Sequence, residues 1–190
     1  MNLPKSLLND LKRHGYEFTE NGLFVPRANV MIGGIMTFEH VRGGELIEVE
    51  HAHNIVTNQG LNHILDVVLH GTTAVSPWYI APFEGNYTPL ATDTAANITA
   101  NSTECTAYDE ATRVEYNEAA ASSQSTTNSA NKATFTFNAT KTIYGAFLAS
   151  ASAKSATTGT LLAAVKAGTS KAVVSADQLL ITYTISATST

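Results

Sequence analysis

Leu179-Leu-Ile-Thr-Tyr-Thr-Ile-Ser186 is the stretch that decides the fold class of this chain. Every second residue from Leu179 to Ile185 is apolar, and threonine or serine stands at the positions between from Thr182 to Ser186. This period of two is typical of a strand with one buried and one exposed face. Ala133-Thr-Phe-Thr-Phe-Asn138 repeats the pattern and predicts a second such strand with its two phenylalanines inward.

Further strands are predicted on both sides of these two. Candidate strands cover residues 78–83, 113–118, 143–149 and 160–165. Upstream, residues 35–41 and 45–55 flank Arg42-Gly43-Gly44, and two glycines supply the positive φ of a tight hairpin turn. Short strands at this spacing indicate a mostly β chain, folded as an antiparallel β-sandwich or a jelly-roll-like domain.

One helix near residues 59–70 is expected to cover the sandwich. Its apolar residues are spaced as a stripe that we expect to be buried, namely Leu61, Ile64, Leu65, Val68 and Leu69. Asn58 is the predicted N-cap, and Gly71 is the predicted stop.

The chain is predicted to consist of an N-terminal arm, residues 1–29, and a β-sandwich domain, residues 30–190. The arm carries a short amphipathic helix over Pro4–Arg13, which is too short to be stable alone and must therefore dock. Two long loops are predicted in the domain. The loop near 84–111 is expected to run over the surface or into a neighbour, and the low-complexity loop near 121–131 is expected to be flexible.

Composition argues against several classes of protein. The net charge of −5 does not suit a nucleic-acid-binding protein. No apolar run approaches a membrane span or the core of a signal peptide. The one cysteine, Cys105, allows no disulfide within the chain, and we expect an inert thiol in a loop.

Charge is spread unevenly along the chain. Seven acidic residues and one basic residue lie between Glu84 and Glu118, whereas five lysines and no acid lie between Lys132 and Lys171. One interpretation is solvated loops of opposite sign. The other is an acidic patch on one copy that meets a basic patch on the next.

The residues do not form a catalytic or cofactor-binding motif. Gly33-Gly34 lacks the spacing of a phosphate loop, and no nucleophile elbow is present. We therefore predict a non-enzymatic chain with no cofactor. His51 and His53 point the same way on a strand, so copies around a three-fold axis could share a metal ion, but two ligands are too few within one chain.

Candidate residues for partner binding come from the arm and from the first long loop. In the arm they are Leu7, Leu8 and Leu11, which share one helical face. In the loop they are Phe83 and Tyr87, which flank a Gly-Asn turn, with packing inside the chain as the alternative role.

The order of segments resembles that of small virion structural proteins of tailed bacteriophages. The segments that carry the resemblance are Asn54-Ile-Val-Thr-Asn-Gln-Gly-Leu-Asn-His-Ile-Leu-Asp-Val-Val-Leu-His-Gly71, Trp78-Tyr-Ile80, Phe83-Glu-Gly-Asn-Tyr-Thr-Pro89, Thr106-Ala-Tyr-Asp-Glu-Ala-Thr-Arg113, Ala133–Leu148, Gly159-Thr-Leu161 and Ala176–Thr184. They extend over roughly residues 54–188, and residues 1–50 lie outside them.

This resemblance implies a virion protein without catalytic residues, assembled in the host cytoplasm. Our first expectation is a capsid decoration (cement) protein that binds the major capsid protein and copies of itself, but not nucleic acid or membrane. The alternatives are a tail, collar or fibre-associated subunit and, from another class, a carbohydrate-binding β-sandwich module.

Deletion of residues 1–15 tests the predicted arm. We expect the truncated protein to remain folded, as measured by circular dichroism, but to enter particles less efficiently than the full chain, because the arm contacts a neighbour. A truncated protein that does not fold would show that the helix belongs to the core.

Overall fold

The structure is a computed structural model that describes all residues except 1–3, 8, 10–15, 19–23, 27–29 and 190. It divides into two units, residues 33–186 and residues 1–32 together with 187–190. In the smaller unit, residues 5–7 and 9 are helical, and β1 (Tyr16–Phe18) pairs antiparallel with β2 (Phe24–Pro26). The predicted boundary after residue 29 stays a prediction.

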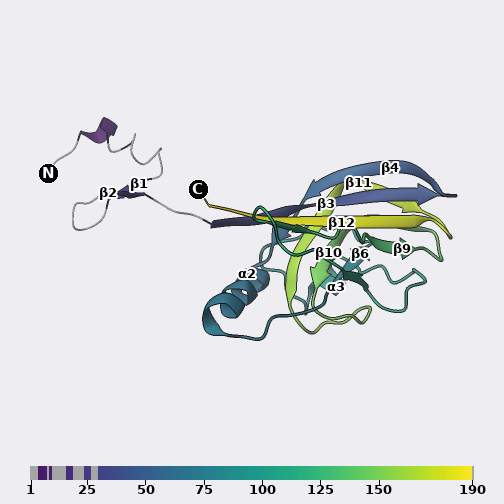
Figure 1. The fold of residues 1–190 in the computed structure, drawn as a ribbon. Helices are drawn as coiled ribbons and strands as arrows, with labels where there is room; N and C mark the ends of the chain where they lie inside the picture. The colour runs from purple at the N-terminus through teal and green to yellow at the C-terminus, as the bar shows by residue number, and fades with distance from the viewer. Residues whose placement is uncertain (1–3, 8, 10–15, 19–23, 27–29, 190) are drawn as a thin grey trace. The chain divides into compact units, whose positions relative to one another are not determined.

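The larger unit is built on two β-sheets (Figure 1). Sheet one has the order β5-β11-β10-β6-β7 and antiparallel pairing throughout, and its strands are β5 (Ile55–Val56), β6 (Trp78–Phe83), β7 (Val114–Tyr116), β10 (Lys141–Ala149) and β11 (Leu161–Val173). Sheet two has the order β4-β3-β12-β8, and β9 also pairs with β12. Its strands are β3 (Val30–Arg42), β4 (Glu45–His53), β8 (Ser125–Thr127), β9 (Ala133–Thr136) and β12 (Gln178–Ser189).

A core between the sheets holds the sandwich together. Sheet two contributes its largest buried side chains from β3, β9 and β12, among them Phe38, Phe135 and Tyr183. Sheet one contributes Ile80, Leu148 and Val165 from the opposite side. The alternation in 179–183 is confirmed, since Leu179, Ile181 and Tyr183 are fully buried. The predicted mostly β fold and antiparallel sandwich are therefore confirmed.

The predicted glycine hairpin joins β3 and β4. Gly43 and Gly44 have φ of 60° and 86°, which glycine adopts without strain. β3 begins at Val30, before the predicted start at residue 35, and runs to Arg42, so the hairpin supplies two long strands of sheet two.

The second face of sheet one is covered by the connection that follows β6. This connection includes the short helix α3 (Ile98–Asn101), and Ala95 and Ile98 pack with Phe83 and Phe147 in a second buried cluster. The long loop near 84–111 was expected to run over the surface or into a neighbour, and in the structure its residues Ala95 and Ile98 pack on its own sheet. The reason is that Ala95 and Ile98 cover apolar side chains that sheet one presents on this face.

A buried ion pair fastens this connection. Arg113 donates to both oxygens of Glu104, from Nε at 2.9 Å and from Nη2 at 2.7 Å, and both side chains are 1% exposed. Two further N–H groups of Arg113 donate to the carbonyls of Ala151 and Ala156, each at 3.0 Å. The pair therefore links the connection to the loop between β10 and β11, and all three guanidinium nitrogens of Arg113 donate hydrogen bonds.

Part of the loop predicted near 121–131 is a strand. Residues 125–127 form β8 and pair with β12, and the Asn128 side chain bonds both Ile181 O and Tyr183 N. Serine and threonine hydroxyls on β8 and β12 also bond each other. Cross-strand bonding of this kind stabilises a strand that composition alone predicts to be a loop.

Asp177 joins the hairpin to the turn before β12. Its buried carboxylate accepts hydrogen bonds from Arg42 Nε at 2.9 Å, from Arg42 Nη2 at 2.7 Å and from Val174 N at 3.0 Å. His40 Nε2 lies 2.8 Å from the same group. The Arg42 hydrogen bond lowers the pKa of Asp177 well below its ordinary value, although burial opposes this shift.

Replacing Asp177 with asparagine tests this contact. Because the folded pKa of Asp177 is depressed, the carboxylate stabilises the fold above about pH 4, its unfolded pKa, and this stabilisation is lost as the pH falls. We expect Asp177→Asn to lower the free energy of unfolding by about 1.5–3 kcal/mol near neutral pH and to weaken its fall with acid.

Urea unfolding over a pH series measures both effects. The control is Asp109→Asn, because Asp109 is an exposed residue whose side chain accepts, among the residues that the structure describes, a hydrogen bond from Asn138 alone. Parallel pH curves for Asp177→Asn and the unaltered chain would contradict the assignment.

Candidate interaction surfaces

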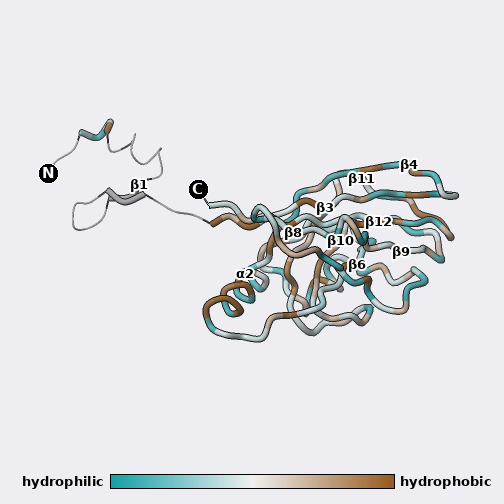
Figure 2. Tube along the Cα trace, in the orientation of Figure 1, coloured by the Kyte–Doolittle hydropathy of each residue, from teal (hydrophilic) through white to brown (hydrophobic). Residues whose placement is uncertain are grey.

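The covering helix exposes most of its apolar stripe. α2 (Asn58–Leu65) continues as a π-helical turn, η1 (Asp66–His70), and ends at Gly71 in the left-handed conformation, as predicted. Leu61, Leu65, Val68 and Leu69 are 37%, 54%, 73% and 78% exposed. The expectation of a buried stripe is therefore wrong for these four, and Figure 2 shows brown, hydrophobic colouring on the later turns of this helix beside its hydrophilic residues.

The exposure follows from the way in which the helix is anchored. Its first turn is fixed to β11, since Thr57 Oγ1 donates to Leu161 O at 2.6 Å and accepts from Gly60 N at 3.0 Å. Thr57, not Asn58, is therefore the N-cap. Gln59 Oε1 accepts from Ala95 N and Leu161 N, which ties the same turn to the connection after β6. Only this first turn is buried against backbone, so the later turns keep an open face.

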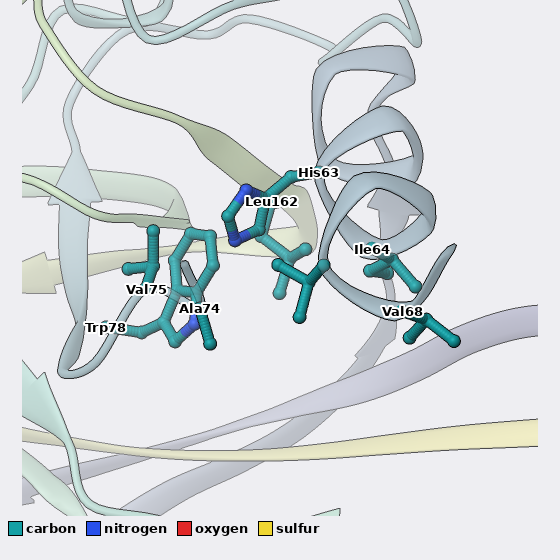
Figure 3. Close-up of a pocket in the computed structure, with 8 residues that line it drawn as sticks. His63, Ile64, Val68, Ala74, Val75, Trp78 and Leu162 are labelled. Carbon is teal, nitrogen blue, oxygen red and sulfur yellow. The ribbon is translucent and has the colours of Figure 1, made fainter. Parts of the chain in front are cut away.

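An apolar pocket lies beside the helix, at the start of β6. It encloses about 280 Å³ and is lined by His63, Ile64, Val67, Val68, Ala74, Val75, Trp78 and Leu162 (Figure 3). The rings of His63 and Trp78 meet edge to face, with centroids 5.6 Å apart and planes at 74°. A pocket with one aromatic wall and aliphatic sides suits an apolar side chain from a protein partner.

The outer face of the hairpin is a second candidate surface. Ile47, Val49, His51 and His53 are all exposed on β4, and Ile35 is exposed on β3 opposite His53. His51 and His53 are exposed with the buried Ala52 between them, so the prediction that the two histidines point the same way is confirmed. His51 Nδ1 lies 2.8 Å from Thr37 Oγ1, so one of its ring nitrogens is engaged. Among the described residues, no three His, Cys, Asp or Glu side chains gather as a metal site.

The candidate partner-binding residues differ in how far the fold buries them. Phe83 is fully buried in the second cluster, so it offers no surface, and the prediction of a partner contact is corrected for this residue. Tyr87 packs against the same cluster and donates its hydroxyl to Asp93 at 2.9 Å. Leu7 is 43% exposed, while Leu8 and Leu11 lie outside the described residues.

Lysines of the basic segment pair within the chain. Lys132 bonds Glu39 and Lys141 bonds Glu84, each in an ion pair shorter than 3 Å. Lys171 is fully buried and bonds Glu48 and Glu50 of β4. These three lysines of the basic segment are therefore paired with carboxylates of the same chain.

Cys105 is buried in the main core rather than placed in an open loop, and burial raises the pKa of its thiol.

In the part of the chain that the structure describes, no helix has the length and hydrophobicity to cross a membrane.

Comparison with protein families gives a match over most of the chain. Residues 55–187 match the family described as "Podophage GP4 fiber I protein gp80", which is well over half of the chain. No curated protein matches the sequence. The matched range begins at β5 and includes sheet one, the covering helix and β12 up to Ala187, whereas the β3–β4 hairpin precedes it.

Sequence reasoning missed the Trp78 pocket and the open helix face. Periodicity shows that a helix has an apolar stripe, but it cannot show whether that stripe is covered by the same chain. The sequence does show that the later turns are rich in apolar side chains, since four of the six residues Leu65–His70 are apolar.

Gly60→Ala tests how the helix is positioned. A Cβ at Gly60 would lie 2.4 Å from Leu162 O and 2.8 Å from Leu162 Cα, so the helix must lift from β11. We expect a loss of about 1–3 kcal/mol in the free energy of unfolding, although alanine favours helices more than glycine does. Urea unfolding measures the loss. Asn62→Ala, at an exposed position of the same helix, is the control, and equal stability of the two variants would refute this packing.

Proposed function

The chain belongs to the podophage GP4 fiber I protein gp80 family and is a virion structural protein of a tailed bacteriophage, and from this we propose that it is a fibre- or tail-associated subunit. The match to a fibre protein family is the observation that carries the proposal. It favours the fibre or tail role over capsid decoration, our first expectation from the sequence.

The surfaces support a role in protein–protein contact. The open face of α2 and η1, the Trp78 pocket and the outer face of β4 all present apolar side chains at the surface. Exposed apolar patches on a folded domain mark sites where other proteins bind. The proposed partners are neighbouring subunits of the fibre or tail and further copies of this chain.

The buried ionisable groups support a structural rather than a catalytic role. Glu104, Arg113, Lys171 and Asp177 each have an oppositely charged partner within the chain. Groups used in this way hold segments together and are not free to exchange protons with a substrate. We therefore propose that the subunit performs no chemistry and needs no cofactor.

The aromatic side chains do not favour the carbohydrate-binding alternative. Trp78 is half-buried with its ring against His63, and Tyr87 is half-buried with its hydroxyl bonded to Asp93. A sugar also needs polar groups beside the aromatic face, whereas the other side chains that line the Trp78 pocket are aliphatic except for His63.

Immunogold electron microscopy of virions that contain this chain tests whether the subunit lies on the fibres or tail or on the head. We expect label from antibodies against residues 33–186 on fibres or tail, and on the order of a dozen copies per particle by quantitative mass spectrometry, as a symmetric tail assembly would hold. Antibodies against the major capsid protein serve as the control, with label over the whole head. Label over the head, together with hundreds of copies, would restore the decoration role.

A further inference from the structure

The inner face of β4 carries acidic side chains where a strand of a sandwich usually carries apolar ones. Glu48 and Glu50 are partly buried on this face, whereas Ile47 and Val49 on the opposite face are 50% and 46% exposed. An acid that faces the interior is costly unless a partner compensates its charge. The partner here is Lys171 of β11, whose side chain is fully buried.

The amine of Lys171 contacts both carboxylates. Its Nζ donates to Glu48 Oε1 at 2.7 Å, to Glu50 Oε2, and to the carbonyl oxygen of Thr169 at 2.7 Å. In the other lysine–carboxylate ion pairs of the described residues, a single carboxylate meets a lysine that is 34% or 31% exposed. Lys171 differs from these lysines in its full burial and in its second carboxylate.

The backbone of β11 presents two N–H groups to the other oxygen of Glu50. β11 bulges between residues 166 and 171, where its register with β10 shifts. In this bulge Gly168 N donates to Glu50 Oε1, and Thr169 N lies 3.2 Å from each oxygen of the same carboxylate. Two N–H groups aimed at one oxygen stabilise the negative charge that develops there when the carboxyl carbon is attacked.

We propose that Lys171 Nζ and Glu50 Cδ form an amide bond within the chain, with Glu48 as the proton carrier. Nζ is the nucleophile, Oε1 becomes the oxyanion beside the two backbone N–H groups, and Oε2 is the leaving oxygen. The bond joins β11 of sheet one to β4 of sheet two. It goes beyond the proposed function, and because it forms once and within the subunit, no substrate is turned over.

The atoms and charges of this step balance without a co-reactant. Burial raises the pKa of Glu50, but the hydrogen bonds that its carboxylate accepts lower it further, so the pair starts as an ammonium and a carboxylate. Glu48 takes one ammonium proton, and the freed amine attacks Glu50 Cδ. Glu48 then returns this proton to Oε2, and the nitrogen gives up a second one. The bond between Cδ and Oε2 breaks, two protons leave with Oε2 as water, and the third stays on the amide nitrogen.

Burial favours the amide over the ion pair. The product replaces two opposite charges with one neutral group, so the cost of keeping these charges away from water disappears. Its oxygen retains the N–H donors of Gly168 and Thr169. The full burial of Lys171 also keeps water from the bond once it has formed.

Mass spectrometry of the unaltered full chain tests the bond directly. We expect the denatured chain to weigh one water molecule less than its sequence requires. Trypsin should release residues 43–113 joined to residues 167–190, because a lysine in an amide bond is not cleaved. A chain without this loss, or a loss of water that maps to other residues, would overturn the proposal.

Variants separate bond formation from folding, which circular dichroism checks for each of them. Lys171→Arg keeps the charge but cannot form this amide, so it should have its full sequence mass. Glu48→Gln cannot carry the proton, and we expect the linked fraction at a fixed time after cell-free synthesis to fall at least about tenfold.

Glu39→Gln is the matched control, since Glu39 also lies in the β3–β4 hairpin and pairs with a different lysine, Lys132. This variant should lose the water at the rate of the unaltered chain. A folded Glu48→Gln chain that links at the same rate as Glu39→Gln would refute the assignment of Glu48 as the proton carrier.

Discussion

Sheet one is apolar on both faces, and the rest of the structure follows from the need to cover both. Leu148 and Ala146 face the core shared with sheet two, whereas Phe147 and Ala149 belong to the second cluster. Sheet two covers one side, and the connection after β6 covers the other. That connection has little regular structure, so it depends on the Glu104–Arg113 pair, which is bonded to the loop after β10 and lies beside Phe147. Removal of either partner would leave a buried charge uncompensated.

Segments that are distant in the sequence are joined by polar contacts, as disulfides or metal ions join them in other small folds. Asp177 joins the hairpin to the turn before β12, and Lys171 joins β11 of sheet one to β4 of sheet two. Both contacts hold the β3–β4 hairpin, which precedes the range matched by the fibre family. The hairpin is therefore integrated into the sandwich, although the family resemblance does not extend to it.

The surfaces left for partners are those that this architecture does not cover. Both faces of sheet one are covered by other parts of the chain. The exposed apolar side chains lie elsewhere, on the helix and on the outer face of β4. The helix is anchored through its first turn, at Thr57, Gln59 and Gly60, and its later turns are open. A virion subunit needs such surfaces, because its function is to hold other subunits in place.

The sequence by itself determined the strands with strict alternation, the glycine hairpin and the existence and end of the helix, since each depends on residues close together in the chain. Tertiary structure decided which segments bury each apolar face. Phe83 is core, the loop predicted near 84–111 packs on sheet one, and the stripe of the helix faces outward, because burial depends on segments that lie far apart in the sequence. Thr57 became the N-cap for the same reason, since its hydroxyl also bonds Leu161 across that distance. Periodicity identifies an apolar face, but only the assembled sheets show whether the chain covers that face or leaves it for another molecule.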